Sequence, residues 1–152
     1  MLTDQAVFIR LLLSVVLGGL IGLERQLHRR EAGLRTHILV SLGSCLIMLT
    51  SLYVFDIYKD LVKIDPGRIA AGVITGIGFL GAGAIMRDRE GVRGLTTAAS
   101  LWVVSGIGLG AGCGFWSAAV FTTILTLAVL LVLRRLESKV LDKEKEGKTN
   151  GL

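Results

Sequence analysis

This 152-residue sequence has few of the residues that a soluble domain of its size normally contains. It has one proline, two cysteines, 6% aromatic residues and 19% charged residues, whereas soluble domains carry about 25% charged residues. Two cysteines cannot hold a chain of this length together, which excludes a disulfide scaffold. The few charges are also bunched, and they leave uncharged runs too long for a small soluble core. Composition therefore excludes a soluble enzyme and a disordered tail protein.

What the sequence does contain is apolar and small. Hydrophobic residues make up 52% of the chain and glycine contributes 20 residues, with a mean hydropathy of +0.67. An apolar run of about 20 residues can cross the hydrocarbon core as a helix, and lipid offers no partner for open backbone groups. The sequence predicts an all-α integral membrane protein, a bundle of about five transmembrane helices. The predicted spans lie near residues 6–23, 36–55, 66–86, 95–112 and 115–133.

The basic residues predict the orientation of these spans. Thirteen Lys and Arg residues fall in the first and third loops and in the tail, against three in the second loop. Because cytoplasmic loops are enriched in Lys and Arg, we expect the N-terminus outside and the C-terminus inside. Residues 1–133 would form the transmembrane domain, and residues 134–152 a charged cytoplasmic tail, partly disordered. The net charge of +5 then reflects membrane orientation, and we expect a lipid bilayer rather than nucleic acid as the partner.

Polar residues at the span ends are candidates for a functional cluster. Glu24 and Arg25 follow the first span, and Arg35 begins the second. A carboxylate at the membrane boundary is costly unless it is paired, so Glu24 could pair with one or two arginines; anchoring to lipid headgroups is the alternative. At the outer end of the third span, Asp65 and Arg68 form a similar pair, and Asp65 before Pro66 predicts a helix N-cap.

No Asp or Glu lies within the interior of any predicted span. A Mg²⁺ pathway favours carboxylate ligands, and proton-coupled transporters place acidic or histidine relays at mid-depth. We therefore assign no metal site and expect no cofactor, although association with Mg²⁺ stays open. The sequence also has no zinc spacing and no nucleophile–base pattern, so we do not expect an enzyme. His28 and His37 are expected to be solvated or interfacial.

Glycines spaced four residues apart predict close helix–helix contacts, because small residues let backbones approach in lipid. Gly76-x-Gly78-x-x-Gly81 matches the dinucleotide fingerprint, but the motif lies inside a predicted span and lacks its strand and acidic residue. The ridges could pack the bundle internally or form a homodimer. The helix-packing candidates are Gly18, Gly22, Gly72, Gly76, Gly106 and Gly110, with a further pair at Gly108 and Gly112.

Four stretches of this chain resemble the MgtC/SapB family of bacterial inner-membrane proteins. They read GGLIGLERQ (18–26), AGLRTHILVSLGS (32–44), DPGRIAAGVITGIGFLGAGAIMR (65–87) and VRGLTTAASLWVVSGIGLGAG (92–112). The resemblance implies a multi-pass inner-membrane protein of about five helices. It places the family's polar signature on Glu24, Arg25, Arg35, Thr36, Asp65, Arg68, Thr96 and Thr97.

The resemblance also implies a function in magnesium homeostasis and stress adaptation. Such proteins are connected with modulation of other membrane proteins, such as ATP synthase or P-type Mg²⁺ pumps, and with Mg²⁺ uptake. From the missing interior carboxylates we expect modulation of membrane-protein partners, with a transporter or channel for Mg²⁺ or another ion as the alternative. Two departures matter: Gly72 stands where many members carry glutamine, and the tail is too short for the ACT-like domain of some members.

Overall fold

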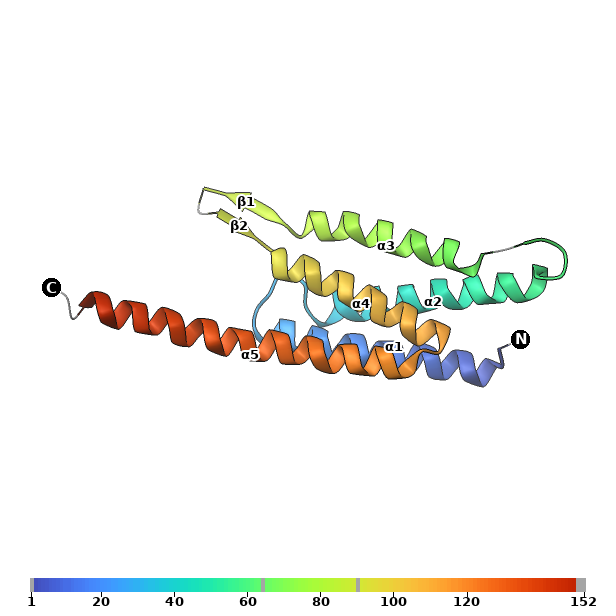
Figure 1. The fold of residues 1–152 in the computed structure, drawn as a ribbon, viewed down its shortest axis with the longest axis horizontal. Coiled ribbons are helices and arrows are strands. Elements are labelled where there is room, and N and C mark those ends of the chain that lie inside the picture. Colours follow the sequence, from blue (N-terminus) through green and yellow to red (C-terminus); the bar gives the residue numbers. More distant parts are fainter. Residues whose placement is uncertain (1, 64, 90, 150–152) are drawn as a thin grey trace.

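A computed structural model describes residues 2–63, 65–89 and 91–149, with side chains up to Arg134 except that of Asp88. These residues form five helices and one antiparallel β-hairpin (Figure 1). The elements are α1 (Asp4–Leu27), α2 (Leu34–Tyr58), α3 (Pro66–Gly83), β1 (Met86–Asp88), β2 (Gly91–Arg93), α4 (Leu95–Cys113) and α5 (Trp116–Thr149). The predicted all-α membrane bundle is thereby confirmed.

Four of the helices are long and apolar enough to cross a membrane: α1, α2, α4 and the Trp116–Arg134 part of α5. Helix α3 is shorter, with 18 residues, and its first turn contains Pro66, Gly67 and Arg68. As predicted, Asp65 caps this helix, since its Oδ1 accepts a hydrogen bond from the backbone N–H of Gly67 at 2.8 Å.

The third predicted span was too long at its C-terminal end. Helix α3 ends at Gly83, and the chain then forms the hairpin, in which Met86 pairs with Arg93 and Asp88 with Gly91. Gly94 follows the hairpin with a φ of 86°, and a Cβ at this position would overlap the carbonyl oxygen of Ala84. Only glycine fits both the backbone conformation and this close approach.

The core of the bundle lies where α1, α2 and α4 meet. Its buried residues include Leu17, Ile21, Val104 and Ile107, with Ala119 of α5 packed on them. Helix α3 lies on the outside of this group, against α2 and α4, with only Ile77 and Gly81 buried (Figure 1).

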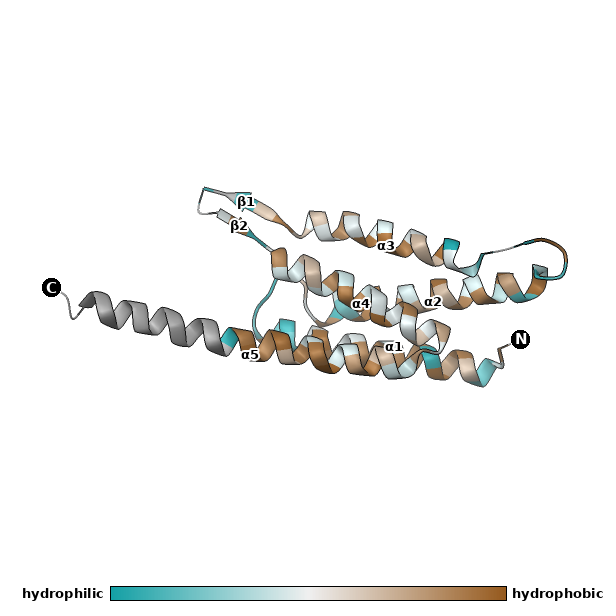
Figure 2. Cartoon of the chain, in the orientation of Figure 1, coloured by the Kyte–Doolittle hydropathy of each residue, from teal (hydrophilic) through white to brown (hydrophobic). Residues whose placement is uncertain are grey.

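The outer surface of the helices is apolar, as lipid contact requires. Figure 2 shows hydrophobic residues along all the bundle helices and hydrophilic ones gathered near the ends. Phe8, Leu12, Phe79 and Phe121 are 72%, 65%, 83% and 61% exposed. In water such a surface would be an aggregation liability, whereas in a bilayer it is the contact with lipid.

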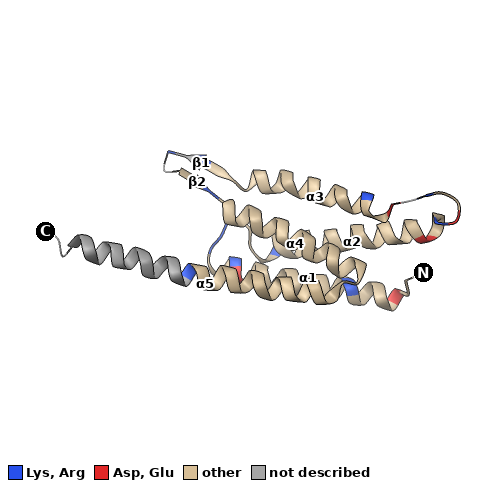
Figure 3. Ribbon diagram, viewed as in Figure 1, with Lys and Arg blue, Asp and Glu red and all other residues tan. Residues whose placement is uncertain are grey.

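The charges mark two different ends of the bundle (Figure 3). At one end, called the basic end below, lie the α1–α2 loop with Arg29 and Arg30, the hairpin, the start of α4 and Arg134 of α5. Helix α5 continues beyond this end to Thr149.

Candidate functional site at the basic end

A buried hydrogen-bond chain joins α1, the α1–α2 loop and α4 at the basic end. Arg25 Nη2 donates to Thr97 Oγ1 at 3.0 Å, and the Thr97 hydroxyl donates to Glu31 Oε2 at 2.7 Å. Arg25 and Thr97 are 3% and 1% exposed. The structure thus brings two predicted site residues, Arg25 and Thr97, into one network with Glu31.

Glu24 lies beside this chain. Its Oε1 is 2.8 Å from His28 Nδ1, and its Oε2 is 3.9 Å from Arg25 Nη1. The carboxylate is 7% exposed, and a buried charge is tolerated when it has a partner of opposite sign. The pairing of Glu24 with an arginine, one of the two readings of the sequence, is therefore present, and His28 adds a second partner.

His37 extends the polar group into the bundle. Its Nδ1 lies 2.9 Å from the carbonyl oxygen of Gly33, and its Nε2 lies 3.0 Å from Ser100 Oγ. The Ser100 hydroxyl in turn donates to the carbonyl oxygen of Thr97 at 2.8 Å. His37 is fully buried, so the expectation of a solvated or interfacial histidine was wrong for this residue. Its contacts with the Gly33 carbonyl oxygen and with Ser100 of α4 supply the partners that permit its burial.

The pKa of Glu31 reflects this network. The Thr97 hydroxyl, which donates to the carboxylate, holds the pKa of Glu31 below its ordinary value, and the positive charges of Arg25 and Arg30 act in the same direction. Glu31 therefore stays ionised, and its bond to Thr97 is charge-assisted.

Small residues allow the helices that carry these side chains to approach closely. A Cβ at Gly18 would lie 2.6 Å from Ser41 Cβ, and one at Gly22 would lie 2.8 Å from Leu34 Cα. Gly108 and Gly112 pack on α2 in the same way, against Ser41 and Cys45. Gly110 contacts Ala119 of α5, whereas Gly72, Gly76 and Gly106 have no neighbouring heavy atom within 4 Å of a Cβ position.

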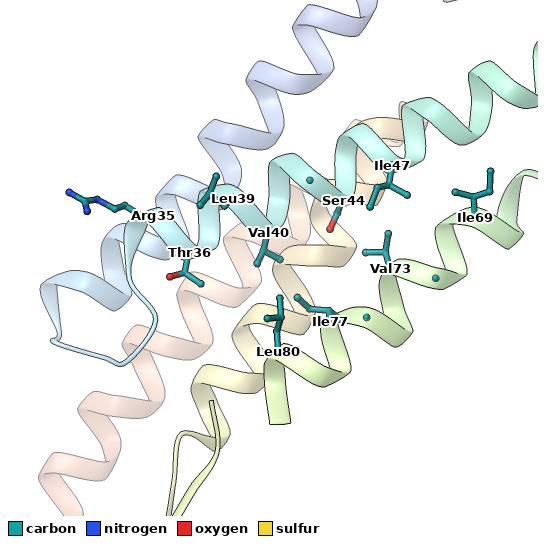
Figure 4. A pocket seen from close by; sticks show the side chains of 13 residues that line it. Arg35, Thr36, Leu39, Val40, Ser44, Ile47, Ile69, Val73, Ile77 and Leu80 are labelled. Carbon is teal, nitrogen blue, oxygen red and sulfur yellow. The ribbon is translucent and has the colours of Figure 1, made fainter. Parts of the chain in front are cut away.

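Among the other predicted site residues, Thr96 lies beside the buried network and the rest lie apart from it. Arg35 and Thr36, at the start of α2, line a cleft of about 560 Å³ between α2 and α3 (Figure 4). Asp65 is at the opposite end of the bundle as the cap of α3, with Arg68 in the first turn of that helix. Thr96 lines a second cleft of about 520 Å³ at the basic end, together with Glu24 and Arg25.

Sequence reasoning missed three members of the network, Glu31, His37 and Ser100. Glu31 stands among arginines in a loop, with nothing to indicate a bond to a residue 66 positions away. A signal for His37 exists: His37, Ser41, Ser44 and Cys45 follow helical spacing on one face of α2, and all four are buried.

The arrangement offers donors and acceptors rather than a cage for a metal. Among the described residues, no group of three or more His, Cys, Asp or Glu side chains could hold a metal ion. Cys45 is buried and Cys113 is exposed, and both are free.

Comparison with known proteins gives a consistent family. The model of the MgtC family matches residues 11–139. The chain is 44% identical to the putative magnesium transporter YhiD of Escherichia coli K12 over 137 residues, which are 89% of this chain and 64% of that protein. It is 44% identical to Protein MgtC of Salmonella typhimurium strain 14028s over 132 residues, 87% of this chain and 54% of that protein.

An uncharacterised protein of Haemophilus influenzae is 42% identical over 125 residues, 80% of this chain and 52% of that protein. The chain thus spans about half to two thirds of the length of these curated relatives. No solved structure matches it. With the family model covering most of the chain and with its long apolar helices, this multi-pass protein of the bacterial inner membrane belongs to the MgtC family.

Proposed function

We propose that this chain acts in magnesium homeostasis and stress adaptation by binding and modulating other membrane proteins, of the ATP synthase or P-type Mg²⁺ pump class. The names of two relatives, Protein MgtC and a putative magnesium transporter, support the link to magnesium. The main support for this mode of action is the cleft between α2 and α3. We interpret it as a surface that binds a transmembrane helix of another protein.

This cleft, called the α2–α3 cleft below, is largely apolar, and three glycines lie in its walls. Val40 and Ile47 of α2 face Val73, Ile77 and Leu80 of α3 across it, while Arg35 extends away at one end (Figure 4). The glycines in its walls, Gly43, Gly72 and Gly76, have no heavy atom within 4 Å of a Cβ position. A partner helix could approach these bare backbone surfaces closely, which is how helices associate in lipid.

The polar groups within the spans favour this function over transport. The hydroxyls of Ser14, Ser105 and Thr123 donate to carbonyl oxygens of their own helices. The donor hydrogens of these three hydroxyls are therefore engaged within their own helices. A transporter or channel for Mg²⁺ or another ion is the second candidate, and the name of the Escherichia coli relative favours it.

The modulator function can be tested by filling the α2–α3 cleft. Gly76→Leu places a bulky side chain in it, whereas Gly78→Leu, on the same helix, adds the same side chain at another open position outside the cleft. Each variant is assayed for growth of the parent bacterium at limiting magnesium and for cross-linking from a photoreactive residue at Leu39, which lines the cleft and is 66% exposed. Leu12 of α1, equally exposed, is the matched cross-linking control.

We expect G76L to lose both growth and the adduct formed from Leu39, and G78L to retain both. Full activity of G76L in both assays would contradict the proposal. An adduct of twice the chain's mass would assign the cleft to a second copy, a homodimer, instead of another membrane protein.

A further inference from the structure

A second cleft lies at the basic end, between α1, α4 and α5, and its lining changes from apolar to charged along its length. The apolar part is formed by Ala99, Val129, Leu130 and Leu133, and the charged part by side chains of the α1–α2 region and the end of α5. This cleft, called the α1–α4–α5 cleft, has a volume of about 520 Å³. Val129 to Leu133 belong to the α5 segment that is apolar enough to cross a membrane, and Arg134 is the first charged residue of this helix. The cleft therefore extends from hydrocarbon depth to the level of the headgroups.

The charged part of this cleft favours an anion. Of the charged side chains described here, Arg25, Arg30 and Arg134 line it together with one carboxylate, that of Glu24. The first turn of α4 also lies here, with Leu95 and Thr96 in the wall, and its N-cap Gly94 has no side chain to satisfy the first backbone N–H groups. Unpaired N–H groups at a helix start add positive potential.

Two residues that line the cleft each have a buried polar atom without a hydrogen-bond partner. Among the side chains that the structure describes, Arg25 Nε has no acceptor and Glu24 Oε2 has no hydrogen-bond donor, although their residues are only 3% and 7% exposed. Buried polar atoms without partners are rare in folded proteins. A ligand that fits must therefore carry an acceptor for the arginine and a donor for the carboxylate, and an apolar portion for the rest of the cleft.

We propose that the α1–α4–α5 cleft binds an anionic phospholipid whose headgroup carries hydroxyl groups, as phosphatidylglycerol does. The phosphate accepts hydrogen bonds from Arg25, Arg30 and Arg134, and a headgroup hydroxyl donates to Glu24 Oε2. An acyl chain lies along Leu130 and Leu133. Basic pockets between transmembrane helices commonly recognise lipid headgroups.

Three comparison compounds each lack one feature of phosphatidylglycerol that the cleft is proposed to recognise. Glycerol 3-phosphate has the phosphate and hydroxyls without acyl chains, so it leaves the apolar wall uncovered. Phosphatidylmethanol has the same single charge as phosphatidylglycerol without the hydroxyls, so it leaves Glu24 Oε2 without a donor. Phosphatidylcholine has no net charge.

The experiment is native mass spectrometry of the full chain in detergent, titrated separately with these four compounds. The test variant is Arg30→Gln with Arg134→Gln, which removes two charges from the cleft. The matched control is Arg29→Gln with Arg35→Gln, which removes two charges from the same end of the bundle but outside the cleft. Melting temperatures in lipid-free detergent verify that both double variants fold.

We expect one phosphatidylglycerol to bind at least tenfold more tightly than phosphatidylcholine, and more tightly than phosphatidylmethanol. The cleft variant should lose about tenfold in affinity, since each lost cation removes a favourable contact with the headgroup, and the control should change less than twofold. Equal losses in the two double variants would show diffuse charge attraction and overturn the proposal. Glycerol 3-phosphate binding as tightly as the lipid would also overturn it.

Discussion

Arg25 of α1 and Thr97 of α4 lie 72 residues apart in sequence, yet the Arg25 guanidinium donates to the Thr97 hydroxyl over 3.0 Å in a buried setting. The same hydroxyl donates to Glu31, so one side chain connects two helices and the loop between α1 and α2. Arg25 and Thr97 thus link α1 to α4 at the basic end.

Removing the Thr97 hydroxyl should destabilise the protein. In Thr97→Val the shape is kept, but Arg25 Nη2 loses its acceptor and Glu31 its donor, and an unsatisfied buried group costs about 1–3 kcal/mol. Thermal unfolding in detergent measures the effect. Thr97→Ser, which keeps the hydroxyl, is the control, and a Val variant as stable as the Ser variant would show that the bonds contribute nothing.

The bond to Glu31 should also make stability depend on pH. The folded-state pKa of Glu31 is lowered, so the bond's contribution is fully present above the ordinary glutamate pKa of about 4.3 and is lost as the pH falls through the lower, folded-state pKa. We expect the stability gap between wild type and Glu31→Gln to be constant from pH 7 to pH 5 and to close at more acid pH. A gap that widens on acidification would reverse the sign and contradict the assignment.

Two glycines of α4 should respond oppositely to alanine. At Gly108 a Cβ would overlap the backbone of Ser41, whereas at Gly106 it would meet no heavy atom within 4 Å. Overpacking costs about 1–3 kcal/mol, so Gly108→Ala should lower the melting temperature. Gly106→Ala should leave it unchanged or raise it, because alanine favours the helix. Similar melting temperatures for the two variants would mean that α2 and α4 are not in close contact.

The glycine pairs show which helix contacts can be predicted from sequence spacing and which cannot. Their spacing predicted close packing, and Gly18, Gly22, Gly108 and Gly112 do pack against α2. The same spacing at Gly72 and Gly76 leads to an open cleft, because a four-residue repeat defines a helix face without specifying what lies against it. Which face is covered depends on the position of α3 outside the other helices.

The number of helices and the residues at which they begin were readable from the sequence for a physical reason, although among the described residues only four of the five predicted spans are long and apolar enough to cross a membrane. Lipid requires long apolar runs, and caps such as Asp65–Pro66 use local chemistry. The hairpin was not readable, because strands of three residues, Met86–Asp88 and Gly91–Arg93, are too short for alternation to be recognised. The contacts of Glu31 and His37 were hidden for another reason: their partners, Thr97 and Ser100, are far away in sequence.

Orientation in the membrane remains a prediction from the basic residues, and accessibility tests it. In a chain with Cys45 and Cys113 replaced by alanine, single cysteines are introduced at Lys59, between α2 and α3, and at Arg89, in the hairpin turn; both positions are exposed. A membrane-impermeant maleimide added to intact cells should label Lys59→Cys, and should label Arg89→Cys only after permeabilisation. The opposite pattern would place the basic end outside the cell.

The most direct test of the central claim, that this protein modulates partners instead of moving ions, is Mg²⁺ flux in proteoliposomes. The purified full chain is reconstituted under a Mg²⁺ gradient, beside protein-free liposomes and beside Glu24→Ala and Asp65→Ala variants at equal protein content. The account predicts the same Mg²⁺ entry with wild-type protein as in protein-free liposomes. Robust entry with the wild type that disappears in either variant would contradict it.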